Sequence, residues 1–200
     1  MSERKYRLTD ETITVFGRTL YRIQATESIP SRYVDKGDLG GFIEKESNLF
    51  GDAWVSGDAR VFGDAWVFGD ARVFGYARVF GDAWVSGYAW VSGDARVFEK
   101  QHIFVAGPAG VESRWVTAAH TGTDEIFVRI GCWEGTITTM MQAVAERRDK
   151  HWGRHDEATQ ERWQAEYQAI HDMIAIRAES WQPEKTTEGE TSDSDDNDRA

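Results

Sequence analysis

Apolar residues recur at a strict interval of six between Gly51 and Phe98. The segment consists of eight units without a gap, which read GDAWVS, GDARVF, GDAWVF, GDARVF, GYARVF, GDAWVS, GYAWVS and GDARVF. Gly, Ala and Val keep fixed places in every unit, and only the positions between and after them change. A fixed period over this length predicts a solenoid, whose units stack to bury one continuous core.

Each unit combines a short strand with a corner. Ala and Val are two residues apart, so their side chains lie on one face of the strand, and the Trp or Arg between them lies on the other face. We expect Ala and Val inside, because both are apolar in every unit. Gly followed by Asp predicts the corner, since Gly admits a positive φ and Asp can bond the local backbone. A corner in every unit gives three flat sides and about eighteen residues per coil.

This pattern resembles the hexapeptide-repeat proteins, in which an aliphatic residue and a small residue four positions later recur in each unit. Here that pair is Val55 with Ala59, and then Val61 with Ala65. The resemblance implies a mainly β fold, built on a left-handed parallel β-helix. It does not imply one function, because this architecture hosts many roles.

The N-terminal residues predict a cap for the solenoid. Alternation over residues 4–26, with a turn at Phe16-Gly17-Arg18, predicts a β-hairpin, and a loop around Pro30 follows it. The open end of a solenoid exposes backbone groups that would pair with any strand. We therefore assign residues 1–36 the role of an N-terminal hairpin cap.

The six-residue register extends beyond the clean units. Traced backwards, Ile43 and Leu49 fall on the Val position, while Gly41 and Ser47 fall on the Ala position. Traced forwards, Ile103 falls on the Val position before Gly-Pro ends the pattern. The β-helix is therefore expected over residues 37–106.

Residues 107–181 predict an α+β domain at the other end. Strand-like runs cover 113–118 and 125–130, and Thr136 is suited to cap a helix. A second, longer helix is expected over 156–181. We assign this domain the second capping role.

The last residues, 182–200, form an acidic tail. Seven acids stand against Lys185 and Arg199, and the segment has no large apolar residue. Such a composition cannot form a core, so we expect a disordered tail.

Outward residues eighteen apart should stack in columns at about the interstrand spacing of ~4.8 Å. The three sides should then be aromatic over most of their area, which marks an interaction surface. The first side carries Trp54, Arg72 and Trp90; the second carries Arg60, Arg78 and Arg96, with Phe62, Phe80 and Phe98 beside them; the third carries Trp66, Trp84 and His102.

The arginine column of the second side calls for anions. Like charges opposite one another repel, and stacking on the adjacent Phe column offsets only part of this repulsion. The anions could be acids of the C-terminal helices, acids of a neighbouring subunit, or the phosphate or carboxylate of a ligand.

Composition narrows the class of protein. The formal net charge is −11, which argues against nonspecific binding to nucleic acid over the whole surface. The single cysteine, Cys132, excludes an intrachain disulfide and fits a reducing cytosol. No run approaches the ~18 apolar residues of a membrane span. We therefore expect a cytoplasmic protein with no membrane contact.

The segments around the repeat carry a closer resemblance. YRLTDETITVFGRTLYRIQA, GDLGGFIEKESNLFGDAWVSGDARV and GCWEGT before a helix pair resemble a group of phage, prophage and bacterial proteins with a small α+β C-terminal domain. Some of these carry labels such as "polymer-forming" or "acyltransferase-like". The resemblance implies a viral or mobile-element origin rather than an activity.

Two functions from different classes follow. The first is a non-enzymatic scaffold that self-associates through its aromatic and arginine sides, with a trimer favoured, and presents its C-terminal domain to a partner such as a host protein. The second is a binder that sequesters a host nucleotide or another anionic small molecule. There Arg60, Arg78 and Arg96 would grip phosphates while neighbouring rings stack on bases.

Catalysis and metal binding have weaker support. Many hexapeptide-repeat proteins are acyltransferases that use a His as base, and His102 is the one His near the repeat tract. Cys132 and His120 could form a nucleophile–base pair, but a core thiol is the expected role of Cys132 after an apolar strand. His151 and His155 have no third ligand in sequence. We expect no metal and no cofactor.

Overall fold

The repeat forms a β-solenoid in the computed structural model, which describes residues 4–181. The tail predicted over 182–200 lies outside the described residues. The fold is mainly β, as predicted, and the solenoid has about three turns. Each unit supplies one two-residue strand: β4 (Trp54–Val55), β5 (Arg60–Val61), β6 (Trp66–Val67), β7 (Arg72–Val73), β8 (Arg78–Val79), β9 (Trp84–Val85), β10 (Trp90–Val91) and β11 (Arg96–Val97).

Strands eighteen residues apart pair in parallel, so the predicted coil length is confirmed. The three sides are the sheets β4–β7–β10, β5–β8–β11 and β6–β9. Trp54 aligns with Arg72, Arg60 with Arg78, and Trp66 with Trp84. The backbone N–H of the outward residue donates to the next coil, as from Arg60 to Ala77 O at 3.0 Å.

The inside and the corners follow the expected chemistry. Every Ala and Val of the eight units is buried. The corner glycines have φ between 60° and 69°, in the left-handed region that side chains avoid. The corner acids act differently from the prediction of local backbone bonds: Asp52, Asp64 and Asp70 form ion pairs with Lys5, Lys45 and Arg32.

The N-terminal hairpin continues one side of the solenoid. β1 (Tyr6–Val15) and β2 (Arg18–Ala25) pair antiparallel, and β2 pairs with β3 (Leu39–Ile43), which runs parallel to β5. One sheet therefore has the order β1–β2–β3–β5–β8–β11. The hairpin thus adds two antiparallel strands to the N-terminal edge of this side.

The degenerate units before the repeat differ from each other. Ile43 aligns with Val61 and Leu49 with Val67, which confirms their predicted register. Ser47 was expected at the inward Ala position, but it is exposed. Asn48 is fully buried in its place, because the chain turns there in the short 3-10 helix Glu46–Asn48. A second 3-10 helix, Pro30–Arg32, lies in the loop after the hairpin.

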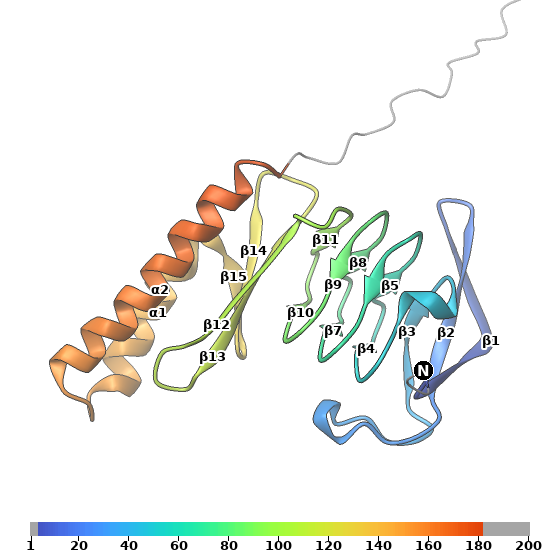
Figure 1. The fold of residues 1–200 in the computed structure, drawn as a ribbon, viewed down its shortest axis with the longest axis horizontal. Helices are drawn as coiled ribbons and strands as arrows, with labels where there is room; N and C mark the ends of the chain where they lie inside the picture. Colours follow the sequence, from blue (N-terminus) through green and yellow to red (C-terminus); the bar gives the residue numbers. More distant parts are fainter. Residues whose placement is uncertain (1–3, 182–200) are drawn as a thin grey trace, which may run out of the picture.

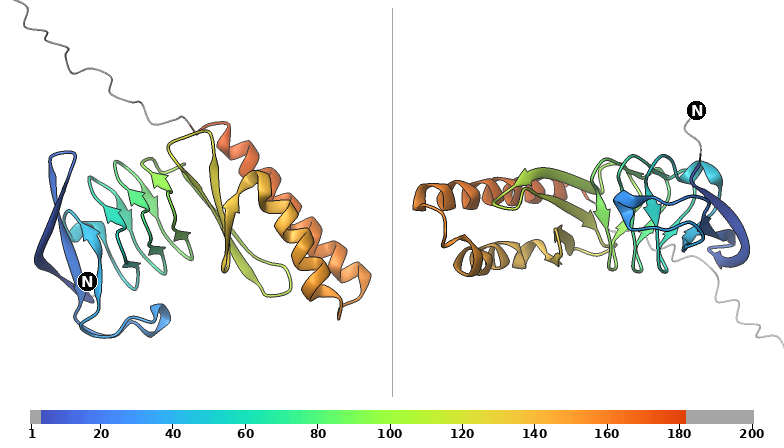
Figure 2. Two further views of the ribbon diagram at one scale, coloured as in Figure 1. Left: turned by 180° about the vertical axis from the view of Figure 1, so that it is seen from behind. Right: turned by 90° about the horizontal axis from the view of Figure 1, so that it is seen from below.

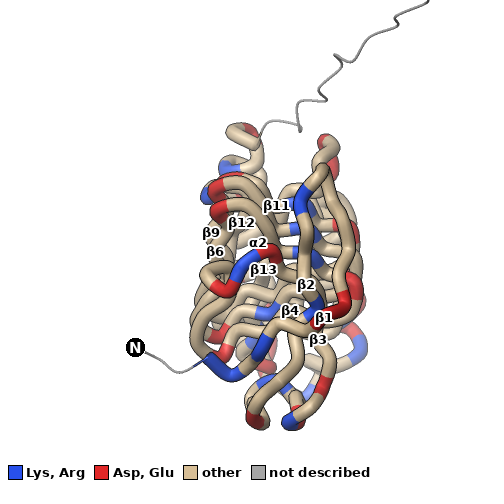
Figure 3. Tube along the Cα trace, turned by 90° about the vertical axis from the view of Figure 1, so that its right-hand side faces the viewer, with Lys and Arg blue, Asp and Glu red and all other residues tan. Residues whose placement is uncertain are grey.

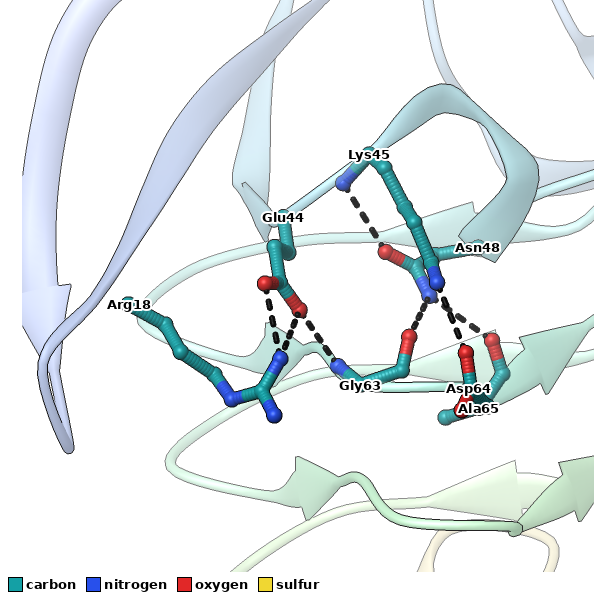
Figure 4. Close-up of polar contacts among 7 residues, drawn as sticks. All are labelled: Arg18, Glu44, Lys45, Asn48, Gly63, Asp64 and Ala65. Atoms are coloured by element: carbon teal, nitrogen blue, oxygen red, sulfur yellow. Dashed lines mark hydrogen bonds and ion pairs between the residues drawn. The ribbon is translucent and has the colours of Figure 1, made fainter.

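Polar contacts fasten this first coil to the next (Figure 4). The Asn48 Nδ2 donates to Gly63 O at 3.1 Å and to Ala65 O at 2.8 Å, while its Oδ1 accepts from the Lys45 N–H at 2.9 Å. Glu44 accepts from the Gly63 N–H at 2.6 Å and also from Arg18 of the hairpin at 2.9 Å. Backbone groups at the first corner are thereby satisfied by side chains.

A four-stranded antiparallel sheet covers the other end of the solenoid. It consists of β12 (Ile103–Ala109), β13 (Arg114–His120), β14 (Ile126–Ile130) and β15 (Trp133–Thr136). β13 and β14 match the two predicted strands, whereas β12 and β15 were not predicted. Ile103 aligns antiparallel with Ala119, so the prediction that Ile103 continues the solenoid register is wrong.

This sheet has two buried faces. Ala119 and Phe127 belong to the core of the solenoid, while Val116, Ala118 and Val128 belong to a second core with the helices. Alternation along the strands produces the two faces. The sheet thus lies between the coils and the helices, with the hairpin at the far end (Figures 1 and 2).

The two predicted helices are present. α1 (Ile137–Arg147) begins after Thr136, its N-cap residue, and continues into the π-helical segment Arg148–Trp152. α2 (Glu157–Ala178) begins after Asp156, whose side chain accepts from the Thr159 N–H at 2.9 Å. The helices pack on the sheet through a core that includes Met140, Val144, Trp152, Trp163, Tyr167 and Ile174.

Candidate functional site

The register places the candidate residues in the expected columns, but the chain covers these columns unequally. Basic and acidic residues are interspersed at the N-terminal end of the molecule (Figure 3), so charge of one sign does not mark one side there. The three sides differ instead in how far their aromatic rings are covered by other segments of the chain.

The phenylalanine column of the second side is partly internal. The Phe62 and Phe80 rings stack with centroids 5.0 Å apart, and those of Phe80 and Phe98 are 5.5 Å apart. Phe62 is buried with Val15 and Leu20 of the hairpin. Phe62 therefore contributes to the N-terminal cap rather than to an open surface.

The arginine column begins at Arg60, which aligns with Phe42 of β3, and it continues through Arg78 and Arg96. A hollow of about 330 Å³ lies at its C-terminal end, lined by Tyr76, Arg78, Asp94, Arg96, Thr121, Thr123 and Glu125. Two carboxylates thus line the same hollow as two guanidinium groups. The acids come from a corner and from the β13–β14 loop, whereas acids of the C-terminal helices were among the expected partners.

The first side is covered by the loop after the hairpin. Trp54 is 3% exposed, so its ring is not part of the accessible surface of this side. Arg32 of the loop donates to Asp52 O at 3.2 Å, pairs with Asp70, and accepts at its backbone carbonyl from Arg72 at 3.0 Å. A second hollow, of about 260 Å³, is lined jointly by this loop and by residues of the first side.

Arginines also surround Trp90, at the C-terminal end of the first side. The Arg72 guanidinium lies 5.0 Å from the Trp90 ring, and the Arg129 guanidinium of β14 lies 5.1 Å from it. The backbone N–H of Trp90 donates to Thr117 Oγ1 of β13 at 3.1 Å. The end of this side is thus built jointly by the coils and the C-terminal sheet.

The third side remains open. Trp66 and Trp84 are 45% and 42% exposed, and their rings stack with centroids 5.5 Å apart and an interplanar angle of 6°. Phe50 lies 5.9 Å from Trp66, and the Lys100 ammonium lies 4.1 Å from the Trp84 ring. Phe50, Trp66 and Trp84 form a continuous apolar ridge, which we call the aromatic ladder.

His102 does not continue the third-side column as expected. It is 1% exposed, its ring stacks on His120 at 4.8 Å, and Phe98 contacts it edge-on at 4.1 Å. Burial, with a smaller contribution from His120, lowers the pKa of His102 to about 4. A neutral, enclosed imidazole is poorly placed to serve as the base of an acyl transfer, which needs contact with its substrate.

Three candidates for catalysis or metal binding remain, and all three are exposed: Cys132, His151 and His155. Cys132 is exposed at the turn between β14 and β15, so the prediction of a core thiol is wrong. His151 is exposed, and His155 contacts Trp163 edge-on at 4.8 Å. Within residues 4–181, no group of three or more His, Cys, Asp or Glu is arranged to hold a metal ion.

Sequence reasoning missed the residues that complete the first side. Arg32, Trp115 and Arg129 come from segments outside the repeat, so the six-residue period gave no signal for them. Arg129 interrupts the apolar run EIFVRIG, and an arginine within an otherwise apolar strand is the one hint the sequence offered.

Compared with known proteins, the chain matches no protein-family model and no curated protein sequence. In the described part of the chain, no helix combines the length and the apolar character needed to cross a bilayer.

Proposed function

We propose that the protein is a non-enzymatic interaction scaffold, in which the aromatic ladder docks against a second copy of the chain. The C-terminal domain then faces a partner, for example through Met173 and Ile176, which are exposed on α2. The resemblance of the repeat to left-handed, hexapeptide-repeat proteins of phage type supports this proposal, and it favours a trimer over a dimer.

One observation carries the proposal: the chain covers the rings of the first side and part of the second, but it leaves the third side open. Trp66 and Trp84 are the large rings of the repeat strands that stay exposed. Contiguous apolar surface of this kind marks protein contacts more often than solvent-facing structure. The stable position of such a ridge is against another apolar surface.

The stacking geometry favours a protein over a sugar or a base. Both of those ligands stack on the faces of aromatic rings. In the ladder, Trp66 and Trp84 cover each other, and Phe50 and Lys100 occupy the two ends of the stack. The exposed parts of the rings are therefore edges, which suit van der Waals contact with a complementary surface.

The charges beside the ladder favour a second copy as the occupant. Lys45 and Lys100 lie near its two ends, while Asp64 and Asp82 precede the two tryptophans at the corners. Lys45 and Asp64 already pair within the chain at 2.8 Å. A symmetric contact can match Lys100 of one copy with Asp82 of the other. This offsets part of the repulsion expected between copies with a net charge of −11.

Sedimentation velocity of the double variant Trp66→Ser/Trp84→Ser tests the proposal. We expect the variant to sediment as a monomer under conditions in which the wild type is associated, because the apolar edges are removed. The matched control is Arg60→Ser/Arg78→Ser, which changes the same repeat position on the second side. Equal association of the wild type and the tryptophan variant would overturn the proposal, and loss of association only in the control would move the interface to the second side.

A further inference from the structure

A cavity of about 190 Å³ lies at the junction of the first side and the C-terminal sheet. Its walls come from three parts of the chain that are far apart in sequence: the loop after the hairpin, the last coil, and strands β13 and β14. The lining residues are Arg32, Tyr88, Trp90, Glu112, Ser113, Arg114, Trp115, Thr117, Arg129 and Gly131.

Positive charge exceeds negative charge around this cavity. Arg32 pairs with Asp70, and Arg129 pairs with Glu134. Arg72, beside Trp90, donates to a backbone carbonyl, and within residues 4–181 it has no ion pair with a carboxylate. The Arg32 and Arg129 guanidinium groups are each paired with a carboxylate, and the Arg72 guanidinium adds a positive charge that no described carboxylate pairs with.

The one acid among the lining residues is already paired. Glu112 lines the cavity, but it accepts from Arg114 at 2.8 Å and from Arg147 at 2.5 Å. Its pKa is lowered by these hydrogen bonds, so it stays ionised and occupied. It does not neutralise the inner arginines.

Arg129 has a donor that no described residue satisfies. The residue is only 9% exposed, and its Nη1 donates to Ser92 Oγ at 3.3 Å. Its Nε is buried and has no hydrogen-bond partner among the described residues. Arg129 lines the cavity, and an oxyanion is the acceptor that a guanidinium group binds most strongly.

The guanidinium groups also repel one another. Burial lowers the pKa of Arg72, and the nearby Arg32 charge lowers it further. Burial is likewise the largest cause that lowers the pKa of Arg129, to which Arg72 contributes. An anion placed among these three groups would relieve this repulsion.

The other walls are aromatic. Trp115 stacks on Tyr88 with centroids 4.8 Å apart, and Trp90 forms the floor beside the arginines. The volume is below the range of about 300–1,000 Å³ that holds drug-sized ligands. The cavity is therefore matched to a single ring with one acidic group.

We propose that this cavity binds a small aromatic acid, a planar ring that carries a carboxylate or a phosphate. The oxyanion contacts Arg129, with Arg32 and Arg72 supplying further positive charge, and the ring lies against Trp115. This site differs from the arginine column of the second side, and it does not depend on self-association through the aromatic ladder.

Isothermal titration calorimetry of the full chain tests the site. The probes are indole-3-carboxylate and phenyl phosphate, which separate a carboxylate source from a phosphate source. Inorganic phosphate, indole and phenol are the matched compounds that lack either the ring or the acid. We expect binding of at least one aromatic acid, with affinity weakened about tenfold or more for each compound that lacks one part.

Two variants locate the binding. Arg129→Lys keeps the charge but removes the Nε–H, and we expect about a tenfold loss of affinity. Trp115→Ala keeps the arginines, and we expect the aromatic acid to bind no better than inorganic phosphate. Arg60→Lys is the control, because it makes the same change on the second side. Retained far-UV circular dichroism shows that each variant is folded.

The outcomes are distinct. Binding of only one of the two acids supports the site and identifies its source. Absence of heat with both acids at about millimolar concentration overturns the proposal. Equal binding of inorganic phosphate overturns the aromatic part, and an equal effect of Arg60→Lys and Arg129→Lys moves the site to the arginine column.

Discussion

Single buried polar residues set the boundaries of the solenoid at the residue scale. Asn48 closes the first coil by donating to two carbonyl groups and accepting from one N–H. His102 marks the other boundary, where the chain leaves the coils for the C-terminal sheet. Each residue occupies a position where the six-residue pattern stops.

Asn48→Asp should destabilise the protein by about 2–4 kcal/mol. The substitution is nearly isosteric, but it replaces the donor with an oxygen that faces the carbonyl groups of Gly63 and Ala65. Urea unfolding measures the change. Ser47→Ala is the neighbouring control, and it should stay within about 0.5 kcal/mol because Ser47 is exposed. Equal stabilities of the two variants would contradict the capping role of Asn48.

His102 should make the fold sensitive to acid. Its pKa is about 4 in the folded state, against 6.5 for a free side chain. The unfolded chain therefore binds the proton first, and stability is lost as the pH falls from about 6.5 to about 4, by about 3 kcal/mol at most. Urea unfolding at several pH values measures this loss. His102→Phe, which cannot be protonated, should lose less stability over that range; an identical loss would exclude His102 as the cause.

At the scale of elements, the solenoid and its caps are joined by register. β3 fits the coils because Gly41 lets it approach closely: a Cβ there would lie 2.6 Å from Ala59 O. On the opposite end, β13 and β14 direct alternate residues to the coils and to the helices. Each cap therefore packs on particular sides of the solenoid and depends on their position in the coil.

Insertion of whole units tests this dependence on register. A second copy of residues 63–80 placed after Phe80 adds one coil and returns every column to its side, so thermal unfolding should occur at the same or a higher temperature. A second copy of residues 63–68 placed after Phe68 rotates the C-terminal sheet by one side, and the unfolding temperature should fall. Equal unfolding temperatures for the two insertion variants would show that the packing of the caps does not depend on the register of the coils.

The sequence predicted the coils and columns because one short unit determines them. The period set the pairing of Arg60 with Arg78 and the burial of every repeat Ala and Val. Exposure was not predictable in the same way. Trp54 and Trp66 occupy the same place in their units, yet one is covered by a loop and the other is open. That difference depends on contacts with segments that have no period.

The C-terminal domain shows the same limit. β13 and β14 were predictable from their apolar runs, but β12 was not, because Ile103 fits both the repeat register and an antiparallel strand. Cys132 follows an apolar strand, but it lies in a turn and is exposed. The arginine cavity also needed the structure, since it combines Arg32 with Arg129 across three parts of the chain.

At the scale of the whole molecule, other segments of the chain cover both ends of the solenoid, while the aromatic rings of the third side stay exposed. The hairpin and the four-stranded sheet occupy the ends, and the loop carrying Arg32 covers much of the first side. The aromatic ladder has no such cover. A molecule built this way can associate laterally, through the third side, without extending its coils end to end.

The mass of the full chain in solution tests this account most directly. Light scattering over about a hundredfold range of protein concentration should show the mass rising from that of one chain, 22.7 kDa, to a small multiple of it. A mass of one chain at every concentration would contradict the account, because the open side would then need no second copy.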